Sequence, residues 1–499
     1  MEVPLSHREH DDGSWWSRAA GGREVLAIAL PMVASTISWT LMTYIDRRIL
    51  HKVSGAAMSA GFNGSVTWFA SLSLLWGICS YTSTFVSQYH GDDQPEQIGR
   101  VTWQGVWLAV LFAPLCFLLW PIAPYFFALH SPEVADLETR FFRILCWAAP
   151  GMLTAQALEA FYSGRGRTWV VMLVDAVAVF INYVLANVLV LGLGGFEPWG
   201  MEGAAWATTA AQWSRAAMFF ALAMLPGNRR TYQMLRGMRL DPKLLVRLVR
   251  FGGPSGVQMM LDVGGFTIFV LLVGQLGPLA MEATSAAFTV SHVAFMPVWG
   301  LGMATVILVG QHLGENRAHL AERATRTTLV LALAYMGAIS LTFVLAPGTF
   351  LSGLLAQGEN GRAADPAVQT LAVHLLRFVA AYNLFDAVAI IFVSALKGAG
   401  DTAFIMRTSV VMATGLTGCT WFGATYLDFD VYGCWAVITI DVWLIALVYL
   451  LRFRWGPWRS MRVIEHIHHP APTLDEGLRH SARAVLSEDV PAASASSPG

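Results

Sequence analysis

The sequence predicts an all-α integral membrane protein with about twelve transmembrane helices, arranged as two parallel-repeat lobes of six helices each. Three observations predict this fold class. Hydrophobic residues make up 55% of the 499-residue chain and charged residues only 13%, against about 25% charged residues in a typical soluble domain. Apolar runs of about 20 residues, each long enough to cross a bilayer core, recur along the chain. The two halves of the chain also resemble each other.

Each apolar run is expected to be a helix. A membrane-spanning strand needs only about ten residues of alternating polarity, whereas these runs are longer and uniformly apolar. Prolines inside the runs, such as Pro31, Pro114, Pro254 and Pro297, predict bends because each removes a backbone donor. In chain order, the spans are expected near residues 25–46, 57–88, 101–128, 140–162, 168–193, 203–225, 248–276, 285–313, 325–355, 369–396, 404–426 and 433–454.

The distribution of Lys and Arg predicts the orientation, because short loops rich in these residues remain on the cytoplasmic side. The loops after the fifth, seventh and eleventh spans are nearly free of basic residues. The first loop departs from the pattern, since it carries Arg47, Arg48 and Lys52 on the outer side. The sequence therefore predicts a multi-pass protein of the cell (inner, cytoplasmic) membrane with both termini cytoplasmic. The connection after the sixth span is the most basic, with Arg229, Arg230, Arg236, Arg239, Lys243, Arg247 and Arg250.

The internal repeat appears when the two halves of the chain are aligned without gaps so that Pro31 falls on Pro254. Each half holds six spans, an even number, so both halves cross the membrane in the same sense. Parallel halves of this kind form transporters that bind substrate between them near the midplane. The same alignment pairs Trp76-Gly77 with Trp299-Gly300, Gln88 with Gln311 and Gly91 with Gly314, and Gly164-x-Gly166-x-Thr168 recurs later as Gly398-x-Gly400-x-Thr402.

Five segments follow from this organisation. We expect a cytoplasmic N-terminal tail (1–22), an N-terminal lobe (23–226), a basic cytoplasmic linker (227–247), a C-terminal lobe (248–456) and a cytoplasmic tail (457–499). The tail is expected to be disordered because Pro, Ala, Ser and charged residues fill it without an apolar period. A net charge of −1 predicts no nucleic-acid partner. No G-x-x-x-x-G-K-[ST] motif is present, so ATP and other cofactors are not expected.

Two acids inside apolar spans are the main candidate functional residues. A charge inside a membrane is costly and by default suggests function. Asp262 lies eight residues after Pro254, and Asp386 lies one helical turn after Tyr382, so Tyr382 and Asp386 share a helix face. These groups could bind Na⁺ or a proton. The alternatives are a protonated Asp262 bonded to a neighbouring helix and a Tyr382–Asp386 hydrogen bond that only holds helices together.

Asp46, at the end of the first span, is a third candidate for binding a cation or proton. Arg47 and Arg48 follow it directly, so a local ion pair at the membrane edge is a competing interpretation. Glu159 lies near Arg165 and Arg167, and a salt bridge with them is the simpler interpretation of that acid.

Aromatic side chains are expected to line a substrate cavity, since ring faces attract organic cations. Phe266 and Phe269 follow Asp262 by four and seven residues, which predicts that they share its helix face. Trp76 and Trp299, which the repeat pairs, are further candidates for the cavity wall. Most of the 19 tryptophans are expected to serve helix packing or the membrane interface.

Several ordered motifs resemble the multidrug and toxic compound extrusion (MATE) family of secondary antiporters over roughly residues 23–460. They include Pro31 followed by Leu41-Met42-Thr43-Tyr44-Ile45-Asp46, Asn182-Tyr183-Val184-Leu185, Gly203-Ala204-Ala205-Trp206-Ala207-Thr208, Pro254 with an acid eight residues on, Tyr382-x-x-x-Asp386, Ala395-Leu396-Lys397-Gly398, Gly433-Cys434-Trp435 and Arg452-Phe453-Arg454-Trp455-Gly456-Pro457-Trp458.

The resemblance implies an exporter that exchanges Na⁺ or H⁺ for an organic cation by alternating access of two lobes. It implies ion-binding roles for Asp46, Asp262 and Asp386, with Tyr382 beside the last. Ala186 stands where one branch of the family has an aspartate, which favours an ion site in the C-terminal lobe, with Asp262 and Asp386 as the Na⁺ ligands.

The transport cycle is expected to use Pro31 and Pro254 as hinges in equivalent helices. The expected partners are the lipid bilayer and a small organic cation, and the expected state is a monomer. A flippase for lipid-linked saccharides, with a related two-lobed fold, is the alternative. Such substrates are anionic, so the acids inside the spans argue against it, while Arg215 and Arg377 keep it open. An enzyme is not expected, because no clustered catalytic residues with a nucleophile are apparent.

Overall fold

The computed structural model describes residues 14–128, 130–193, 195, 197–355 and 366–465, and all regular elements within these ranges are helical. Twelve long helices match the twelve expected spans. They are α1 (Gly22–His51), α2 (Gly55–Ser80), α4 (Pro95–Phe126), α5 (Pro132–Ser163), α6 (Thr168–Leu191), α7 (Gly200–Ala223), α10 (Pro242–Gly274), α11 (Pro278–Gly314), α12 (Ala318–Leu345), α14 (Pro366–Ala399), α15 (Thr402–Tyr426) and α16 (Val431–Trp455). Shorter elements are α3 (Thr82–Gly91), α8 (Pro226–Thr231), α9 (Met234–Gly237), α13 (Pro347–Leu355) and the 3₁₀ turn η2 (Pro457–Ser460).

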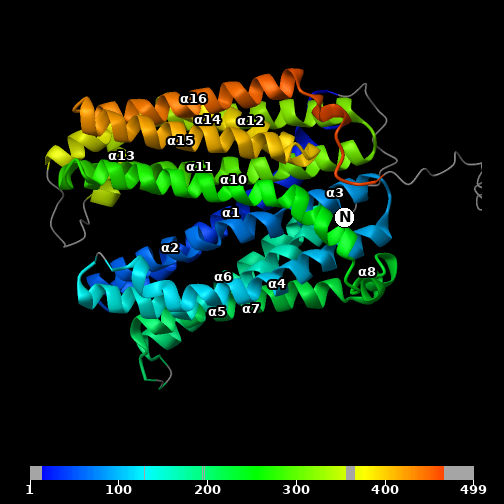
Figure 1. Cartoon of the computed structure of the whole chain (residues 1–499), viewed down its shortest axis with the longest axis horizontal. Coiled ribbons are helices and arrows are strands. Elements are labelled where there is room, and N and C mark those ends of the chain that lie inside the picture. Colours follow the sequence, from blue (N-terminus) through cyan, green and yellow to red (C-terminus); the bar gives the residue numbers. More distant parts are fainter. Residues whose placement is uncertain (1–13, 129, 194, 196, 356–365, 466–499) are drawn as a thin grey trace, which may run out of the picture. The chain divides into compact units, whose positions relative to one another are not determined.

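The helices form the two expected lobes. The N-terminal lobe contains α1 to α7 and the C-terminal lobe contains α10 to α16, and Figure 1 shows α4 to α7 gathered together and α14 to α16 gathered together. Helix α1 packs against α6 of its own lobe and α11 of the other, while α2 packs against α5 and α10. These contacts hold both lobes, as far as Val463, in one compact unit. The predicted all-α, two-lobed membrane fold is confirmed.

Hydropathy and length support the membrane assignment for most of these helices. In the described part of the chain, nine segments are long and apolar enough to cross a membrane. The other long helices, α5, α7 and α15, are too polar on average to meet that criterion. Large apolar side chains such as Leu30, Leu271 and Leu345 are 59%, 62% and 73% exposed. Exposure of this kind suits helices that face lipid rather than water.

The linker between the lobes is helical over much of its length, in contrast to a plain basic connection. Helices α8 and α9 lie within it, and α10 begins at Pro242, six residues before the expected start. The Asp241 carboxylate accepts hydrogen bonds from the backbone N–H groups of Lys243 and Leu244, at 3.1 and 3.2 Å. Asp241 is therefore an N-cap, and Pro242 at the first helical position has the backbone angle that a helix start needs.

The expected disorder of the C-terminal tail is wrong for residues 457–463. The Trp458 ring is fully buried, stacks on Phe453 at 4.5 Å between centroids and donates its indole N–H to the Phe453 carbonyl at 2.6 Å. Val463 is also fully buried. Trp458, Met461 and Val463 are isolated apolar residues in a polar stretch, so they gave no periodic signal in the sequence. In the structure, all three side chains are buried or partly buried against the helices. The expected disorder of residues 466–499 concerns residues outside the described part of the chain.

Replacing Trp458 with alanine should lower the free energy of unfolding by about 3 kcal/mol, because a fully buried indole is lost together with its hydrogen bond. Trp455→Ala is the matched control, since that ring is 74% exposed. Thermal denaturation of the two purified variants in detergent measures the difference. Equal melting temperatures for both variants would show that the 457–463 segment contributes nothing to stability.

Candidate functional site

Asp262 lies in α10 among polar groups from three other helices. The Gln258 side-chain amide, one turn earlier, donates a hydrogen bond to the Asp262 carboxylate. Ser409 of α15 and Lys397 of α14 also interact with this carboxylate, and Asp441 of α16 lies close enough to repel it. Although protein groups surround it, the Asp262 side chain remains exposed. Polar groups of α10, α14, α15 and α16 thus surround an acid that keeps some exposed surface.

Lys397, which lies one residue beyond the expected tenth span (369–396), is a partner of Asp262. The structure places Lys397 in the last turn of α14, and its ammonium group attracts the Asp262 carboxylate. The two residues lie on helices far apart in the chain, so their spacing gave no local signal. Any cation that binds at Asp262 has to compete with this built-in positive charge.

Asp386 and Tyr382 form a separate polar group on α14. Tyr382 is buried, interacts with Asp386 one turn later and bonds to Ser291 of α11. Within the described residues, Asp386 makes no hydrogen bond to the protein and shows no interaction with Asp262. Lys397 lies eleven residues after Asp386 (397 − 386), about 16 Å along the helix axis at 1.5 Å per residue. The two acids thus belong to different sites in the C-terminal lobe.

Asp46 points into the N-terminal lobe. The Thr208 hydroxyl of α7 donates to Asp46 Oδ2 at 3.4 Å, and the Asn182 amide of α6 donates to that hydroxyl at 3.3 Å. Arg47 instead stacks on the Phe62 ring, 4.4 Å from its centroid. Within the described chain, no ion pair joins Asp46 to Arg47 or Arg48, so the competing interpretation of a local ion pair is wrong.

Asn182 also interacts with the Asp46 carboxylate itself, yet two oxygens of this group lack a hydrogen bond among the described residues. Asp46 Oδ1 and Asn182 Oδ1 are buried and, among the residues that the structure describes, accept no hydrogen bond. A buried oxygen without a donor is unfavourable, unless a proton or a metal ion occupies the space beside it. A carboxylate, an amide oxygen and the Thr208 hydroxyl are the oxygen ligands that hard cations prefer. Asn182 and Thr208 were recognised from the sequence only as family motifs.

A buried ion-pair network occupies the middle of the N-terminal lobe. Arg215 of α7 pairs with Glu159 of α5 and, at 2.6 Å, with Asp175 of α6. The Ser35 hydroxyl of α1 donates to Asp175. A salt bridge of Glu159 is confirmed, but its partner is Arg215; the expected partner Arg165 stacks on the Phe161 ring at 3.7 Å instead. Helix α7 packs against both α5 and α6, which places Arg215 between the two acids.

The aromatic residues predicted to line a cavity lie in different environments. Phe266 is 43% exposed and contacts Phe288, 4.7 Å between centroids. Phe269 is fully buried in the core of the C-terminal lobe, so in this conformation it does not line a cavity. The reason is that α10 turns this position toward α11 and α16, whose side chains enclose it. The cavity role of Phe266 stays a prediction.

Trp76 and Trp299 occupy equivalent places in the two lobes. Trp76 is buried and lies 6.5 Å from Trp39 and 6.2 Å from Phe69, between ring centroids. Trp299 is half-buried and lies 5.8 Å from Phe295. Both rings therefore belong to small aromatic groups, and their contact with a substrate stays a prediction.

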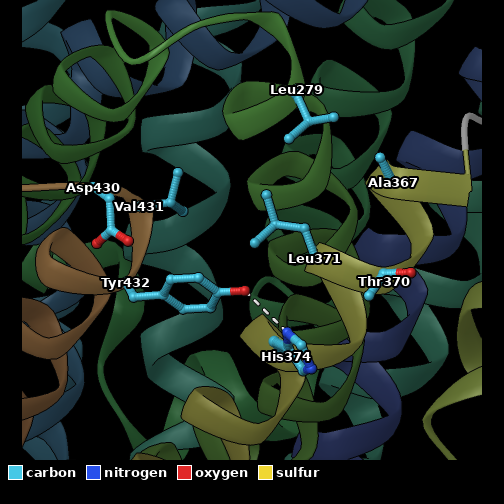
Figure 2. Close-up of a pocket in the computed structure, with 8 residues that line it drawn as sticks. All are labelled: Leu279, Ala367, Thr370, Leu371, His374, Asp430, Val431 and Tyr432. Atoms are coloured by element: carbon cyan, nitrogen blue, oxygen red, sulfur yellow. Dashed lines mark hydrogen bonds between the residues drawn. The ribbon is translucent and has the colours of Figure 1, made fainter.

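A hollow of about 480 Å³ lies at the start of α14, and the candidate ion-binding acids are not among its lining residues. Figure 2 shows the Tyr432 hydroxyl directed at His374, and the two side chains are joined by a 2.9 Å hydrogen bond. His374 precedes Asp386 by twelve residues (386 − 374), about 18 Å along the helix. The hollow is therefore separate from the carboxylate sites. Its other lining residues are Leu279, Ala367, Thr370, Leu371, Asp430 and Val431.

The predicted hinges lie inside continuous helices. Pro31 is within α1 and Pro254 is within α10, and these are helices through which each lobe contacts the other. The structure describes one conformation, so the hinge role stays a prediction.

Comparison with known proteins gives the family. A model of the MatE family matches residues 31–188 and again residues 254–417. The two matches begin at Pro31 and Pro254, the same two residues that the internal repeat superposes. Together they cover well over half of the chain.

The chain belongs to the MatE family.

Proteins of similar sequence and structure agree with this assignment. The chain is 27% identical over 453 residues to the "Probable multidrug resistance protein NorM" of Pseudomonas syringae pv. tomato, with 88% of this chain and 95% of the relative covered. Two solved structures share the fold. A MOP superfamily transporter from Pyrococcus furiosus superposes with a TM-score of 0.78 and 16% identity, over 87% of this chain and 95% of the other. The eukaryotic MATE transporter AtDTX14 superposes with a TM-score of 0.76 and 19% identity, over 88% of this chain and 96% of the other. This MatE protein is thus a multi-pass membrane transporter.

Replacing Arg215 with methionine should be strongly destabilising, by about 3–5 kcal/mol, because it leaves Glu159 and Asp175 buried without a counter-charge. Arg377→Met is the matched control, since Arg377 lies on the exposed surface of α14. Thermal denaturation in detergent provides the readout. Adding Glu159→Gln and Asp175→Asn to Arg215→Met should restore much of the loss. A single variant as stable as the control would contradict the role assigned to this network.

Proposed function

We propose that this protein is a multidrug exporter that exchanges Na⁺ or H⁺ for organic cations by alternating access of its two lobes. The observation that carries the proposal is the group Asp46, Asn182 and Thr208, in which two buried oxygens lack a partner among the described residues. The family and the name of the Pseudomonas relative support the export of drugs. We further propose that the protein lies in the cell membrane with both termini cytoplasmic and works as a monomer.

The coupling ion is proposed to bind at carboxylates of both lobes. In the N-terminal lobe, Asp46 Oδ1 and Asn182 Oδ1 offer oxygen ligands for Na⁺, and a proton on Asp46 could equally use Asn182 Oδ1 as its acceptor. In the C-terminal lobe, Asp386 has Tyr382 as a neighbour, and Asp262 has Lys397. Across the described residues, no group of three His, Cys, Asp or Glu side chains gathers as a metal site, so a Na⁺ site would combine a single carboxylate with neutral oxygens.

The mechanism we propose is competition for negative charge. In the outward-open state, Na⁺ or H⁺ neutralises the carboxylates and weakens their attraction for a bound organic cation, which leaves. The lobes then rock to the inward-open state with Pro31 and Pro254 as hinges. The ion dissociates there, and the restored negative charge attracts the next substrate. Exposed rings such as Phe266 offer apolar and cation–π contact to that substrate.

The flippase alternative loses part of its support. Arg215 is paired with two acids, so it does not offer a free positive charge to an anionic lipid headgroup. Arg377 is exposed on α14 and is the remaining argument for that alternative. Translocation of a fluorescent lipid-linked saccharide into the outer leaflet of vesicles would favour it over cation export.

Efflux of a fluorescent organic cation from proteoliposomes tests the proposal, with Na⁺ and pH gradients imposed separately. Asp46→Asn and Asp386→Asn should each reduce gradient-driven efflux at least about tenfold, because an amide cannot gain and lose a proton or balance a cation's charge. Asp136→Asn is the control, since that acid is exposed and pairs with Arg140. Efflux that ignores both gradients, or that persists in both variants, contradicts the carboxylate mechanism.

A second variant separates the two ions. Thr208→Val removes a neutral oxygen from the Asp46 group but leaves the carboxylate in place. If Na⁺ is the coupling ion, the Na⁺ concentration for half-maximal efflux should rise several-fold. If H⁺ is the coupling ion, efflux should not respond to Na⁺, and loss of the Thr208 hydrogen bond to Asp46 should move the pH for half-maximal efflux upward. An unchanged response to both ions would remove Thr208 from the site.

Lys397→Met should increase the apparent affinity for the coupling ion several-fold, because the built-in competitor for Asp262 is lost. The concentration of Na⁺ or H⁺ that gives half-maximal efflux measures this change. Lys243→Met, at an exposed position near the start of α10, is the control. No shift relative to the control would show that Asp262 is not part of the ion site.

A further inference from the structure

The two lobes are joined at one end of the bundle by a reciprocal pair of glutamine contacts. Gln88, at the end of α3 in the N-terminal lobe, donates its side-chain amide to the Gly398 carbonyl of α14 at 2.9 Å. Gln311, near the end of α11 in the C-terminal lobe, donates its amide to the Gly164 carbonyl after α5, also at 2.9 Å. Both glutamines are buried, at 0% and 2% exposure. We call these two contacts the glutamine lock.

The internal repeat makes these contacts equivalent. Gln88 and Gln311 occupy the same place in the repeat, because the alignment that superposes Pro31 on Pro254 also superposes these two residues. Gly164 and Gly398 open the two copies of the Gly-x-Gly-x-Thr motif. Each lobe therefore supplies one glutamine donor and one glycine carbonyl acceptor. The Gln-x-x-Gly motif of each lobe thus contacts the Gly-x-Gly-x-Thr motif of the other lobe.

The glycines that follow the glutamines allow the helices to approach closely enough. A Cβ atom at Gly91 would lie 2.0 Å from the Gln311 carbonyl oxygen, and one at Gly314 would lie 2.2 Å from the Gln88 carbonyl oxygen. Both distances are far below any permitted contact, so a larger residue at either position would push the lobes apart. The Gln-x-x-Gly motif thus provides both the donor and the space for the approach.

Further hydrogen bonds strengthen the same junction. The Gln88 side-chain oxygen accepts the backbone N–H of Val463 at 2.8 Å, so both polar groups of Gln88 are used. The Tyr81 hydroxyl donates to the Lys397 carbonyl at 3.0 Å. Residues Lys397 and Gly398 therefore accept contacts from the other lobe, while the Lys397 side chain attracts Asp262. The junction and the Asp262 site share one short segment of α14.

We propose that Gln88 and Gln311 are positioning residues of the transport cycle, which hold this end of the lobes closed until the lock is released. The inference rests on the alternating-access part of the proposed function. Two lobes that rock about a central site have to separate here in the other state. Buried amide–carbonyl bonds suit that task, because water can satisfy the same groups once the end opens.

A cysteine at position 87 reports whether this end is open. Ser87 is fully buried at the lobe junction, where a Cβ atom on Gly310 of α11 would lie 2.1 Å from its hydroxyl oxygen. Ser87→Cys is nearly isosteric, and its thiol can react with a water-soluble maleimide only when the lobes part. Cys419 is the exposed native cysteine among five, so the background carries Cys419→Ser. The same proteins without Ser87→Cys measure reaction at the other thiols.

The test uses purified full-length protein that carries Ser87→Cys and Cys419→Ser, in lipid nanodiscs. Adding either Gln88→Ala or Gln311→Ala should raise the rate at which the cysteine at position 87 is labelled about two- to tenfold, the range expected for loss of a buried hydrogen bond. Gln88→Ala should have the larger effect, because it also loses the Val463 contact. Thr328→Val is the matched control: it removes a buried hydroxyl that bonds only to Ala324 of its own helix, at 2.9 Å. Its labelling rate should not change.

Unchanged labelling in both glutamine variants and in the double variant would overturn the proposal, as would an equal increase in Thr328→Val. If an alanine variant does not yield monodisperse protein, Gln88→Asn and Gln311→Asn replace it, since they keep the amide but are one methylene too short. The assay needs no substrate and no ion gradient. Inactive transport with faster labelling would therefore refute the proposed function alone, and active transport with unchanged labelling would refute the lock alone.

Discussion

The bilayer core offers no water to a charge, and this constraint accounts for the position of the ionisable groups in this protein. Arg215 holds Glu159 and Asp175 together in the N-terminal lobe, and the Lys397 ammonium attracts the Asp262 carboxylate in the C-terminal lobe. Such groups are stable inside a membrane only when paired or when they face a polar cavity. Among the described residues, Asp386, Asp441 and one oxygen of Asp46 lack such a partner, and our proposal places the mobile ion at Asp386 and Asp46.

The two lobes use their buried charges differently. In the N-terminal lobe, the arginine network connects α1, α5, α6 and α7 and leaves Asp46 with neutral partners. In the C-terminal lobe, the acids are distributed over α10, α14 and α16, with one lysine among them. The two lobes therefore share the arrangement of their helices but differ in their buried polar side chains. The lock residues retain the two-fold relation, because a junction between two similar lobes places equivalent residues opposite each other.

Helix packing in this fold depends on small residues as well as on charge pairs. A Cβ at Gly77 would lie 2.7 Å from the Gly256 backbone, and one at Gly300 would lie 2.7 Å from the Val33 backbone. These pairs bring α2 against α10 and α11 against α1. Small residues are common where membrane helices meet, because close backbone approach replaces the hydrophobic driving force that lipid removes. The Trp-Gly pairs of the repeat thus mark the helices at which the lobes touch.

The helical membrane fold, the twelve spans and the two-fold repeat could be predicted from the sequence, because apolar runs and rare residues such as Trp-Gly keep their pattern along the chain. It also identified Asp46, Asp262 and Asp386, since an acid in an apolar run is visible without a structure. The partners of these acids were decided only by the tertiary structure. Thr208 lies 162 residues from Asp46, and Arg215 lies 56 residues from Glu159. Local spacing pointed to Arg47 for Asp46 and to Arg165 for Glu159, and both were wrong, because helix packing sets which faces meet.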